Sequence, residues 1–194
     1  MSISRTLKRE LAHIFGGLSI PIAALFLPTM VLLVTLGVAT VVFSAFDLVR
    51  LRAPGANRWF FWLFKPVLQE EETSCLTGAS YMLVASLIAF LAFQRDIAVL
   101  ALSFLAVGDA IATLVGERIG RRRLRGKSLE GSLACFISCV AIGFVFYHVG
   151  LNIPLPIILV GSVCATIGEV IPLPIDDNLT MPLFAGAVMT IMQI

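Results

Sequence analysis

Long apolar segments account for most of this sequence. They cover residues 11–27, 30–49, 75–94, 97–116, 131–149, 154–171 and 179–193. A helix needs roughly 20 mostly apolar residues to cross the hydrocarbon core of a bilayer. In lipid, every backbone polar group must be hydrogen-bonded within the protein, and a helix achieves this within one segment. We therefore expect an all-α, polytopic membrane helix bundle with about seven transmembrane helices.

Composition favours a membrane protein over a soluble one. Hydrophobic residues make up 59% of the 194-residue chain and charged residues only 13%, and the mean hydropathy is +1.00. Soluble domains carry about 25% charged residues, which help to form their water-facing surface. No stretch of the chain is polar enough to fold separately, so we expect one integral membrane domain over residues 1–194. The cysteines form no CxxC pair, which argues against a disulfide framework or a zinc site.

The distribution of charge predicts the orientation of the helices. With a cytoplasmic N-terminus, residues 1–10, 50–74, 117–130 and 172–178 lie on the cytoplasmic side and hold every lysine and arginine except Arg95. This is the positive-inside pattern, to which Asp and Glu contribute little. Because most acidic residues nevertheless fall on the same side, we expect a functional site that faces the cytoplasm.

The richest polar segment runs from Gly108 to Gly131. Asp109 lies inside an apolar segment, where an ionised carboxylate costs roughly 2.5–3.5 kcal/mol, so we expect it to be paired, metal-bound or water-facing. Small residues that allow close approach follow at helical spacing: Ala112, Gly116 and Gly120. A glycine-containing turn with Lys127 then precedes a new helix, and helix N-termini bind phosphate. The run Arg121–Arg125 is also explained by topology or by binding to anionic lipids.

A second group of acidic residues lies near the C-terminus. Glu169 is within an apolar segment, and the adjacent Asp176 and Asp177 precede the last one. Two aspartates at a membrane boundary suit magnesium, which prefers oxygen ligands and often bridges carboxylates to phosphates. The alternative is a solvated loop in which Asp177 or Asn178 caps the next helix.

Two segments in the first half of the chain add further candidates. Glu10 and His13 are three residues apart and share a helix face. His13 could orient a phosphate or relay a proton, and a hydrogen bond to a neighbouring helix is the alternative. Residues 54–66 are rich in Trp and Phe between Arg58 and Lys65, as in amphipathic helices that lie on a membrane surface.

These motifs together resemble those of the dolichol kinase, phytol kinase and CTP-dependent diacylglycerol kinase family. The matching residues occur in family order over most of the chain: Arg9…His13…Gly16, Glu72…Gly78-Ala79-x-Tyr81, Gly108-Asp109-x-x-Ala112-x-x-x-Gly116-x-x-x-Gly120, Gly126-Lys127-Ser128-x-Glu130-Gly131-Ser132, and Glu169…Asp176-Asp177-Asn178-Leu179-Thr180-x-Pro182-Leu183. The resemblance implies transfer of the γ-phosphate of a nucleoside triphosphate, usually CTP, to the hydroxyl of a membrane lipid alcohol, with Mg²⁺ as cofactor.

The resemblance also assigns roles to residues by position. The implied catalytic residues are His13, Asp109, Lys127, Glu130 and Asp177. Contacts to the nucleotide are expected from Gly108, Gly116, Gly120, Arg121, Arg123, Lys127, Ser128, Gly131 and Asn178. The expected magnesium ligands are Asp109, Glu130, Glu169, Asp176 and Asp177. Which carboxylate acts as base and which binds metal stays open.

Two other functions stay open from the sequence. A CTP-dependent cytidylyltransferase that makes a CDP-lipid would use the same nucleotide, but the Pro-Gly-His-Gly-Gly signature of CDP-diacylglycerol synthases is absent. The other function class is a transporter or a non-catalytic membrane protein, and a transporter would be expected to show an inverted repeat and polar residues at the bilayer midplane. The expected partners are a lipid alcohol, a nucleoside triphosphate and the bilayer, with no nucleic acid. The lipid, the donor base and the oligomeric state, a homodimer included, stay open.

Overall fold

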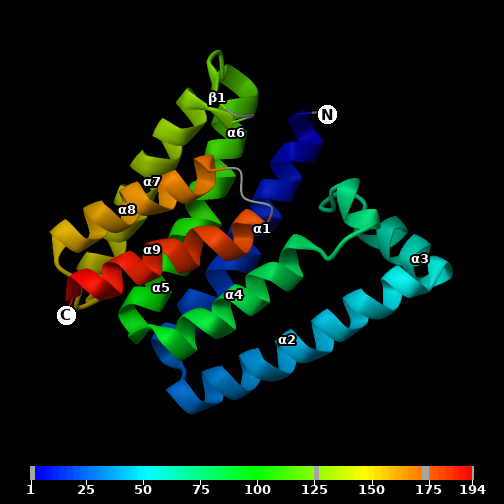
Figure 1. Ribbon diagram of the computed structural model, residues 1–194, viewed down its shortest axis with the longest axis horizontal. Helices are drawn as coiled ribbons and strands as arrows, with labels where there is room; N and C mark the ends of the chain where they lie inside the picture. The colour runs from blue at the N-terminus through cyan, green and yellow to red at the C-terminus, as the bar shows by residue number, and fades with distance from the viewer. Residues whose placement is uncertain (1–2, 125–126, 172–174, 194) are drawn as a thin grey trace.

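The computed structural model describes residues 3–124, 127–171 and 175–193, most of them helical (Figure 1). The helices are α1 (Ile3–Phe26), α2 (Thr29–Arg52), α3 (Pro54–Phe64), the short 3-10 helix η1 (Glu71–Thr73), α4 (Gly78–Ala92), α5 (Arg95–Phe104), the π-helical turn η2 (Leu105–Asp109), α6 (Ala110–Ile119), α7 (Leu129–Val149), α8 (Leu155–Val170) and α9 (Asp177–Gln193). Two short antiparallel strands, β1 (Arg123–Leu124) and β2 (Lys127–Ser128), form a hairpin before α7. The predicted helical bundle is confirmed.

Each predicted apolar segment corresponds to a helix or to a continuous helical unit. Among the described residues, three helices are long and apolar enough to cross a membrane: α2, the unit Arg95–Ile119 that joins α5, η2 and α6, and α7. Helices α4 and α8 are apolar but shorter. An integral membrane protein follows, and the number of helices that cross the bilayer stays a prediction.

The first helix is longer than the apolar pattern indicates. It begins at Ile3 rather than near residue 11, and it continues through Pro21. Its N-terminal turns pack against the protein, since Thr6 and Glu10 are buried there. Membrane helices tolerate an internal proline when neighbouring groups satisfy the freed backbone positions. Pro28 then separates α1 from α2.

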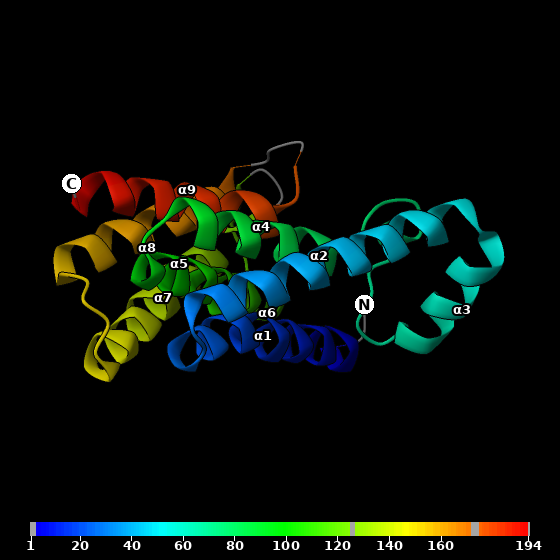
Figure 2. The same cartoon turned by 90° about the horizontal axis from the view of Figure 1, so that it is seen from below.

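Helix α5 lies at the centre of the bundle. Its residues from Ile97 to Phe104 are all buried, and it packs against α1, α7 and α9. Helix α9 runs alongside α4 and α8 (Figures 1 and 2). Helix α6 continues from this core toward the hairpin, so the core fixes the position of the polar residues on η2 and α6.

Helices α2 and α3 lie at the edge of the molecule. Helix α2 packs mainly on α4 and exposes a row of valines, as a helix facing hydrocarbon would: Val31, Val34, Val38, Val41 and Val42. Helix α3 lies at the end remote from α8 in both views (Figures 1 and 2). It buries Phe60 and exposes Trp59 and Trp62. Aromatic side chains of this kind favour the membrane–water interface, consistent with the amphipathic segment expected over residues 54–66.

Candidate active site

A cavity of about 930 Å³ collects most of the polar residues singled out from the sequence. It lies between α1, α4, α6, the start of α7 and the loops before α4 and α9. Its charged lining includes Arg9, His13, Asp109, Lys127, Glu169 and Asp177. Its apolar lining includes Ile20, Phe43, Phe60, Phe64, Leu68 and Met82. One cavity therefore offers both a surface for a charged ligand and a surface for a hydrocarbon chain.

Lys127 is the centre of the charged lining. Its ammonium nitrogen lies 3.1 Å from Oδ2 of Asp177, 3.2 Å from Oε1 of Glu169 and 3.9 Å from Oδ1 of Asp109. Burial disfavours the charged ammonium, but the neighbouring carboxylates of Asp109, Asp177 and Glu169 outweigh it and raise the pKa of Lys127. The lysine therefore stays charged at neutral pH.

The π-helical turn η2 carries Asp109 into the cavity. A π-turn widens the helix by one residue and frequently occurs at functional sites. Gly108 permits the close packing behind this turn, because a Cβ there would lie 2.7 Å from Sγ of Cys139 and 3.1 Å from Sγ of Cys135. Gly108 thus faces the packed interior rather than the cavity, and it supports Asp109 from behind.

The glycines of α6 and α7 allow the hairpin to approach α6. A Cβ at Gly116 would lie 2.7 Å from Oγ of Ser128, and one at Gly131 would lie 2.7 Å from the carbonyl oxygen of Ala112. Ser128 is the N-cap of α7, and its Oγ accepts a hydrogen bond from the backbone N–H of Gly131 at 2.9 Å. Gly120 packs against the same serine. This close packing brings Lys127 over the carboxylates.

Helix α1 contributes His13 to the same cavity. Its Nε2 lies 3.9 Å from Oδ2 of Asp109, is buried and has no hydrogen-bond partner among the described residues. One turn earlier, the guanidinium of Arg9 pairs with the buried carboxylate of Glu10. A buried imidazole with an unsatisfied nitrogen beside a carboxylate is suited to accept a proton or to bind a ligand.

The start of α9 supplies another wall. Oδ1 of Asp176 accepts hydrogen bonds from the backbone N–H and the side-chain amide of Asn178, at 2.9 and 2.7 Å. Burial raises the pKa of Asp176, and the bonds from Asn178 partly oppose this. The Asn178 amide also lies against Gly78, where a Cβ would approach it to 2.9 Å. Asp176 is therefore the residue that holds Asn178 in place.

The structure leaves some of the expected residues outside this cluster. Glu130 accepts hydrogen bonds from the backbone N–H groups of Arg121 and Arg122, at 3.1 and 3.4 Å. The residues that line the cavity include Arg123, Ser128 and Asn178, but not Glu130, Arg121, Gly108 or Gly120.

The carboxylates suit a magnesium ion in their chemistry, because their oxygens are the ligands that magnesium prefers. Within the described part of the chain, no group of three or more His, Cys, Asp or Glu side chains is arranged as a metal site. Asp109, Glu169 and Asp177 are instead grouped around the ammonium of Lys127. The position between them therefore holds a positive charge, which Lys127 supplies.

Ser132 belongs to the motif that follows Lys127, but no role was expected for it. It donates a hydrogen bond to Oε2 of Glu169 at 3.2 Å and so orients a carboxylate of the cluster. Its place one turn after Ser128 on the same helix was the available signal. Phe60 and Phe64 belong to the segment predicted to lie on the membrane surface, but nothing in the sequence indicated that they line this cavity.

Proteins similar in sequence to this chain include kinases of phytol and of diacylglycerol. The chain is 33% identical over 138 residues to a probable chloroplastic phytol kinase of Triticum aestivum, covering 62% of this chain and 46% of that protein. It is 29% identical over 167 residues to the CTP-dependent diacylglycerol kinase 1 of Eremothecium gossypii, covering 74% and 53% respectively. It is also 28% identical over 182 residues to an uncharacterized protein of Rickettsia prowazekii, covering 91% and 89%. No family model and no solved structure matches the chain.

The resemblance inferred from the motifs is thereby confirmed: relatives of this chain are phytol kinases and CTP-dependent diacylglycerol kinases. The chain spans about half the length of these kinases.

Proposed function

We propose that this chain is a membrane lipid-alcohol kinase that transfers the γ-phosphate of CTP to the hydroxyl of an isoprenoid alcohol or diacylglycerol. The observation that carries the proposal is the cavity, in which Lys127 and three carboxylates share one space with apolar side chains. The names of the relatives support CTP as the donor and a lipid as the acceptor.

Phosphoryl transfer demands mainly charge neutralisation and positioning from a protein. In the proposed reaction, the lipid hydroxyl oxygen attacks the γ-phosphorus, the bond to the bridging oxygen breaks and CDP leaves. Lys127 turns from its carboxylate partners to the phosphate oxygens, as a point charge with three donors. Arg123 lines the same cavity and adds a second positive charge.

The proton of the lipid hydroxyl needs an acceptor close to the reacting oxygen. Asp109 and His13 line the cavity 3.9 Å apart, and the free Nε2 of His13 is available to take the proton. Magnesium would be held by Asp109, Glu169 and Asp177 and would supply neutralisation of the β- and γ-phosphates. Asp176 acts through Asn178 in this proposal, and Glu130 acts through the hairpin that carries Lys127.

The proposed orientation places this site at the cytoplasmic face, where nucleotide is available. Basic residues support it, because they gather at the end of the molecule that holds the cavity. Arg9 on α1 and Arg123 on β1 line the cavity itself. Arg118 lies in the last turn of α6.

The test is incubation of the purified protein in detergent with magnesium and γ-labelled CTP or ATP against a panel of lipid alcohols. Label in a lipid phosphate together with free CDP supports the kinase and identifies its acceptor. Release of pyrophosphate with formation of a CDP-lipid would instead indicate a cytidylyltransferase. A lack of both products would contradict the proposal.

A further inference from the structure

A second buried polar network lies at the end of α2, away from the proposed phosphate-binding residues. Asp47 and Arg50 are both 0% exposed and form an ion pair one helical turn apart. A buried ion pair is expensive to desolvate unless further hydrogen bonds satisfy its remaining donors and acceptors. Neither residue lines the cavity, so the proposed phosphoryl transfer does not use them directly.

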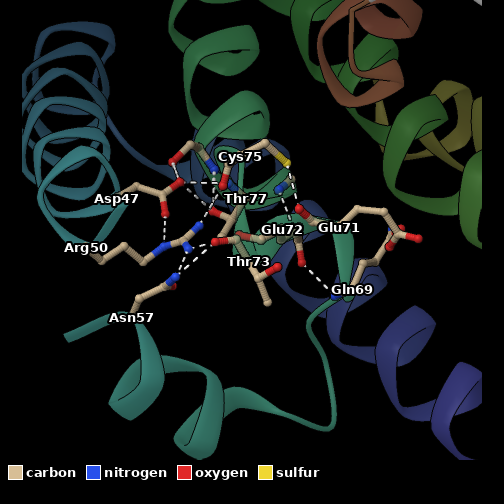
Figure 3. Close-up of polar contacts among 11 residues, drawn as sticks. Asp47, Arg50, Asn57, Gln69, Glu71, Glu72, Thr73, Cys75 and Thr77 are labelled. Atoms are coloured by element: carbon tan, nitrogen blue, oxygen red, sulfur yellow. Dashed lines mark hydrogen bonds and ion pairs between the residues drawn. The ribbon is translucent and has the colours of Figure 1, made fainter. Parts of the chain in front are cut away.

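The Arg50 guanidinium joins three separate segments (Figure 3). Its Nε donates to Asp47, and its Nη1 donates to Oδ1 of Asn57 on α3 at 2.8 Å. The same Nη1 donates to the carbonyl of Glu72 at 2.9 Å, and Nη2 donates to the carbonyl of Cys75 at 2.9 Å. Arg50 thus ties α2 to α3 and to the loop that leads into α4.

The Asp47 carboxylate extends the network to α4. Its Oδ2 accepts hydrogen bonds from the backbone N–H of Thr77 at 2.7 Å and from the hydroxyl of Ser80 at 2.7 Å. The Thr77 hydroxyl also donates to it, at 3.1 Å. Since Thr77 is the N-cap of α4, Asp47 fixes the point at which that helix begins. We call Asp47, Arg50, Asn57 and Thr77 the α2 clamp.

The α2 clamp is continuous with the apolar lining of the cavity. The carbon Cζ of Arg50 lies 5.1 Å from the centre of the Phe60 ring, and Phe60 packs on Phe64, with their ring centres 4.9 Å apart. Both phenylalanines line the cavity, and so does Leu68 in the loop after α3. We call Phe60, Phe64 and Leu68 the apolar wall.

Glu72 of η1 makes hydrogen bonds through both its carboxylate and its backbone carbonyl. The Glu72 carboxylate accepts hydrogen bonds from the backbone N–H groups of Gln69 and Gly78, both at 2.7 Å, while its carbonyl accepts from Arg50 (Figure 3). Gly78 in turn lies against Asn178 of the polar lining. Glu72 therefore ties the segment between α3 and α4 to Arg50 of α2 and to the start of α4.

We infer that Asp47 and Arg50 are positioning residues that hold α3 and the following loop so that the apolar wall can bind the hydrocarbon chain of the lipid substrate. The inference rests on the proposed function for the identity of that lipid. The clamp acts on the lipid side of the cavity, because its contacts reach Phe60 and the α4 N-terminus rather than Lys127.

The first test separates lipid binding from nucleotide binding in steady-state kinetics. Arg50→Lys keeps the charge but loses the planar fork of donors, and Asn57→Ala is a milder change at the more exposed end of the clamp.

In Arg50→Lys we expect the KM for the lipid alcohol to rise about tenfold, with kcat and the KM for CTP nearly unchanged. Asn57→Ala should change the same parameter in the same direction. Arg58→Ala, the adjacent α3 residue outside the clamp, is the matched control and should leave all three values unchanged. Equal losses in every parameter, or no change in the lipid KM, would overturn the inference.

The second test does not depend on activity. Cys75 is exposed and lines the cavity, whereas Cys135, Cys139 and Cys164 are buried. A maleimide should therefore modify Cys75 first, and phytol or diacylglycerol without nucleotide should slow this reaction several-fold in the wild type. Arg50→Lys should abolish that protection. Protection by the lipid in the wild type that is lost in Arg50→Lys supports the inference, even if no lipid is phosphorylated. Protection that is absent in the wild type, or retained in the variant, overturns the inference.

Discussion

The ammonium group of Lys127 lies 3.1 Å from Oδ2 of Asp177, a residue 50 positions further along the chain. This ion pair joins the hairpin before α7 to the first residue of α9. Glu169 on α8 completes the contact at 3.2 Å, so the hairpin, α8 and α9 meet at one nitrogen atom. A lysine in this position can exchange carboxylate partners for phosphate oxygens without changing its own charge.

Replacement of Lys127 tests the role of that charge. Lys127→Ala should lower kcat/KM for the nucleotide by about 10²-fold or more, because the developing charge on the phosphates loses a fixed cation. Lys127→Arg keeps the charge and should retain more activity, although its planar group fits the lysine position poorly. Phosphorylation of a lipid alcohol by labelled CTP measures both. Activity in the alanine variant equal to that of the wild type would remove Lys127 from the proposed mechanism.

Loss of charge at position 127 also leaves three carboxylates together without a cation, so folding must be checked in parallel. Thermal unfolding in detergent with and without added magnesium provides this check. If the carboxylates bind magnesium, the ion should stabilise Lys127→Ala more than the wild type, since the lysine no longer competes for them.

Ser132 is expected to support Glu169. Ser132→Ala removes the donor to Oε2 of Glu169 and should cost about 1 kcal/mol of stability and about tenfold in activity. Ser138→Ala on the same helix is the matched control, because the Ser138 hydroxyl donates to the backbone of its own helix. The assay is the labelled-CTP reaction with each variant at equal protein concentration. Equal activity of the two variants would show that the bond to Glu169 is dispensable.

The sequence was sufficient to predict the helices and the proximity of the polar residues, because both follow from strong physical constraints. Apolar length predicts a membrane helix, and an intramembrane carboxylate such as Asp109 or Glu169 must find a partner. The convergence of these two residues with Lys127 could therefore be expected from the sequence. His13 was singled out because it shares a helix face with Glu10, but nothing in the sequence predicted that it would lie beside Asp109.

The details that the sequence could not provide depend on packing between distant elements. Glu130 looked equivalent to the other carboxylates, but it bonds to backbone N–H groups at Arg121 and Arg122. Gly116 looked like a ligand-facing glycine, whereas it also accommodates the Ser128 side chain. Asp47 and Arg50 carried no motif signal at all, since an i, i+3 charge pair near a helix end is common on protein surfaces.

Gly108 should be intolerant of a side chain. Gly108→Ala places a Cβ 2.7 Å from Sγ of Cys139, and overpacking of a close-packed interior typically costs about 1–3 kcal/mol. Because Asp109 follows directly, activity should fall together with stability. Gly37→Ala is the control: apart from its own helix backbone, no heavy atom lies within 4 Å of its added Cβ, and the helix should gain up to about 1 kcal/mol. Thermal unfolding in detergent measures both variants, and equal midpoints would contradict the packing argument.

Glu130 and Glu169 provide the sharpest test of which carboxylates serve the reaction. Glu169 is buried, bonds to Ser132 and contacts Lys127, so Glu169→Gln should lower kcat by about 10²-fold or more through loss of a ligand charge. Glu130→Gln retains a side-chain oxygen that can accept the hairpin N–H groups, so its activity should stay within about threefold of the wild type. The two rates, measured over a range of magnesium concentrations, give the answer. If Glu130→Gln needs much more magnesium than the wild type, Glu130 binds the metal after all and the hairpin must move to deliver it. If only Glu169→Gln shows this dependence, the metal lies between Asp109, Glu169 and Asp177, where Lys127 now sits.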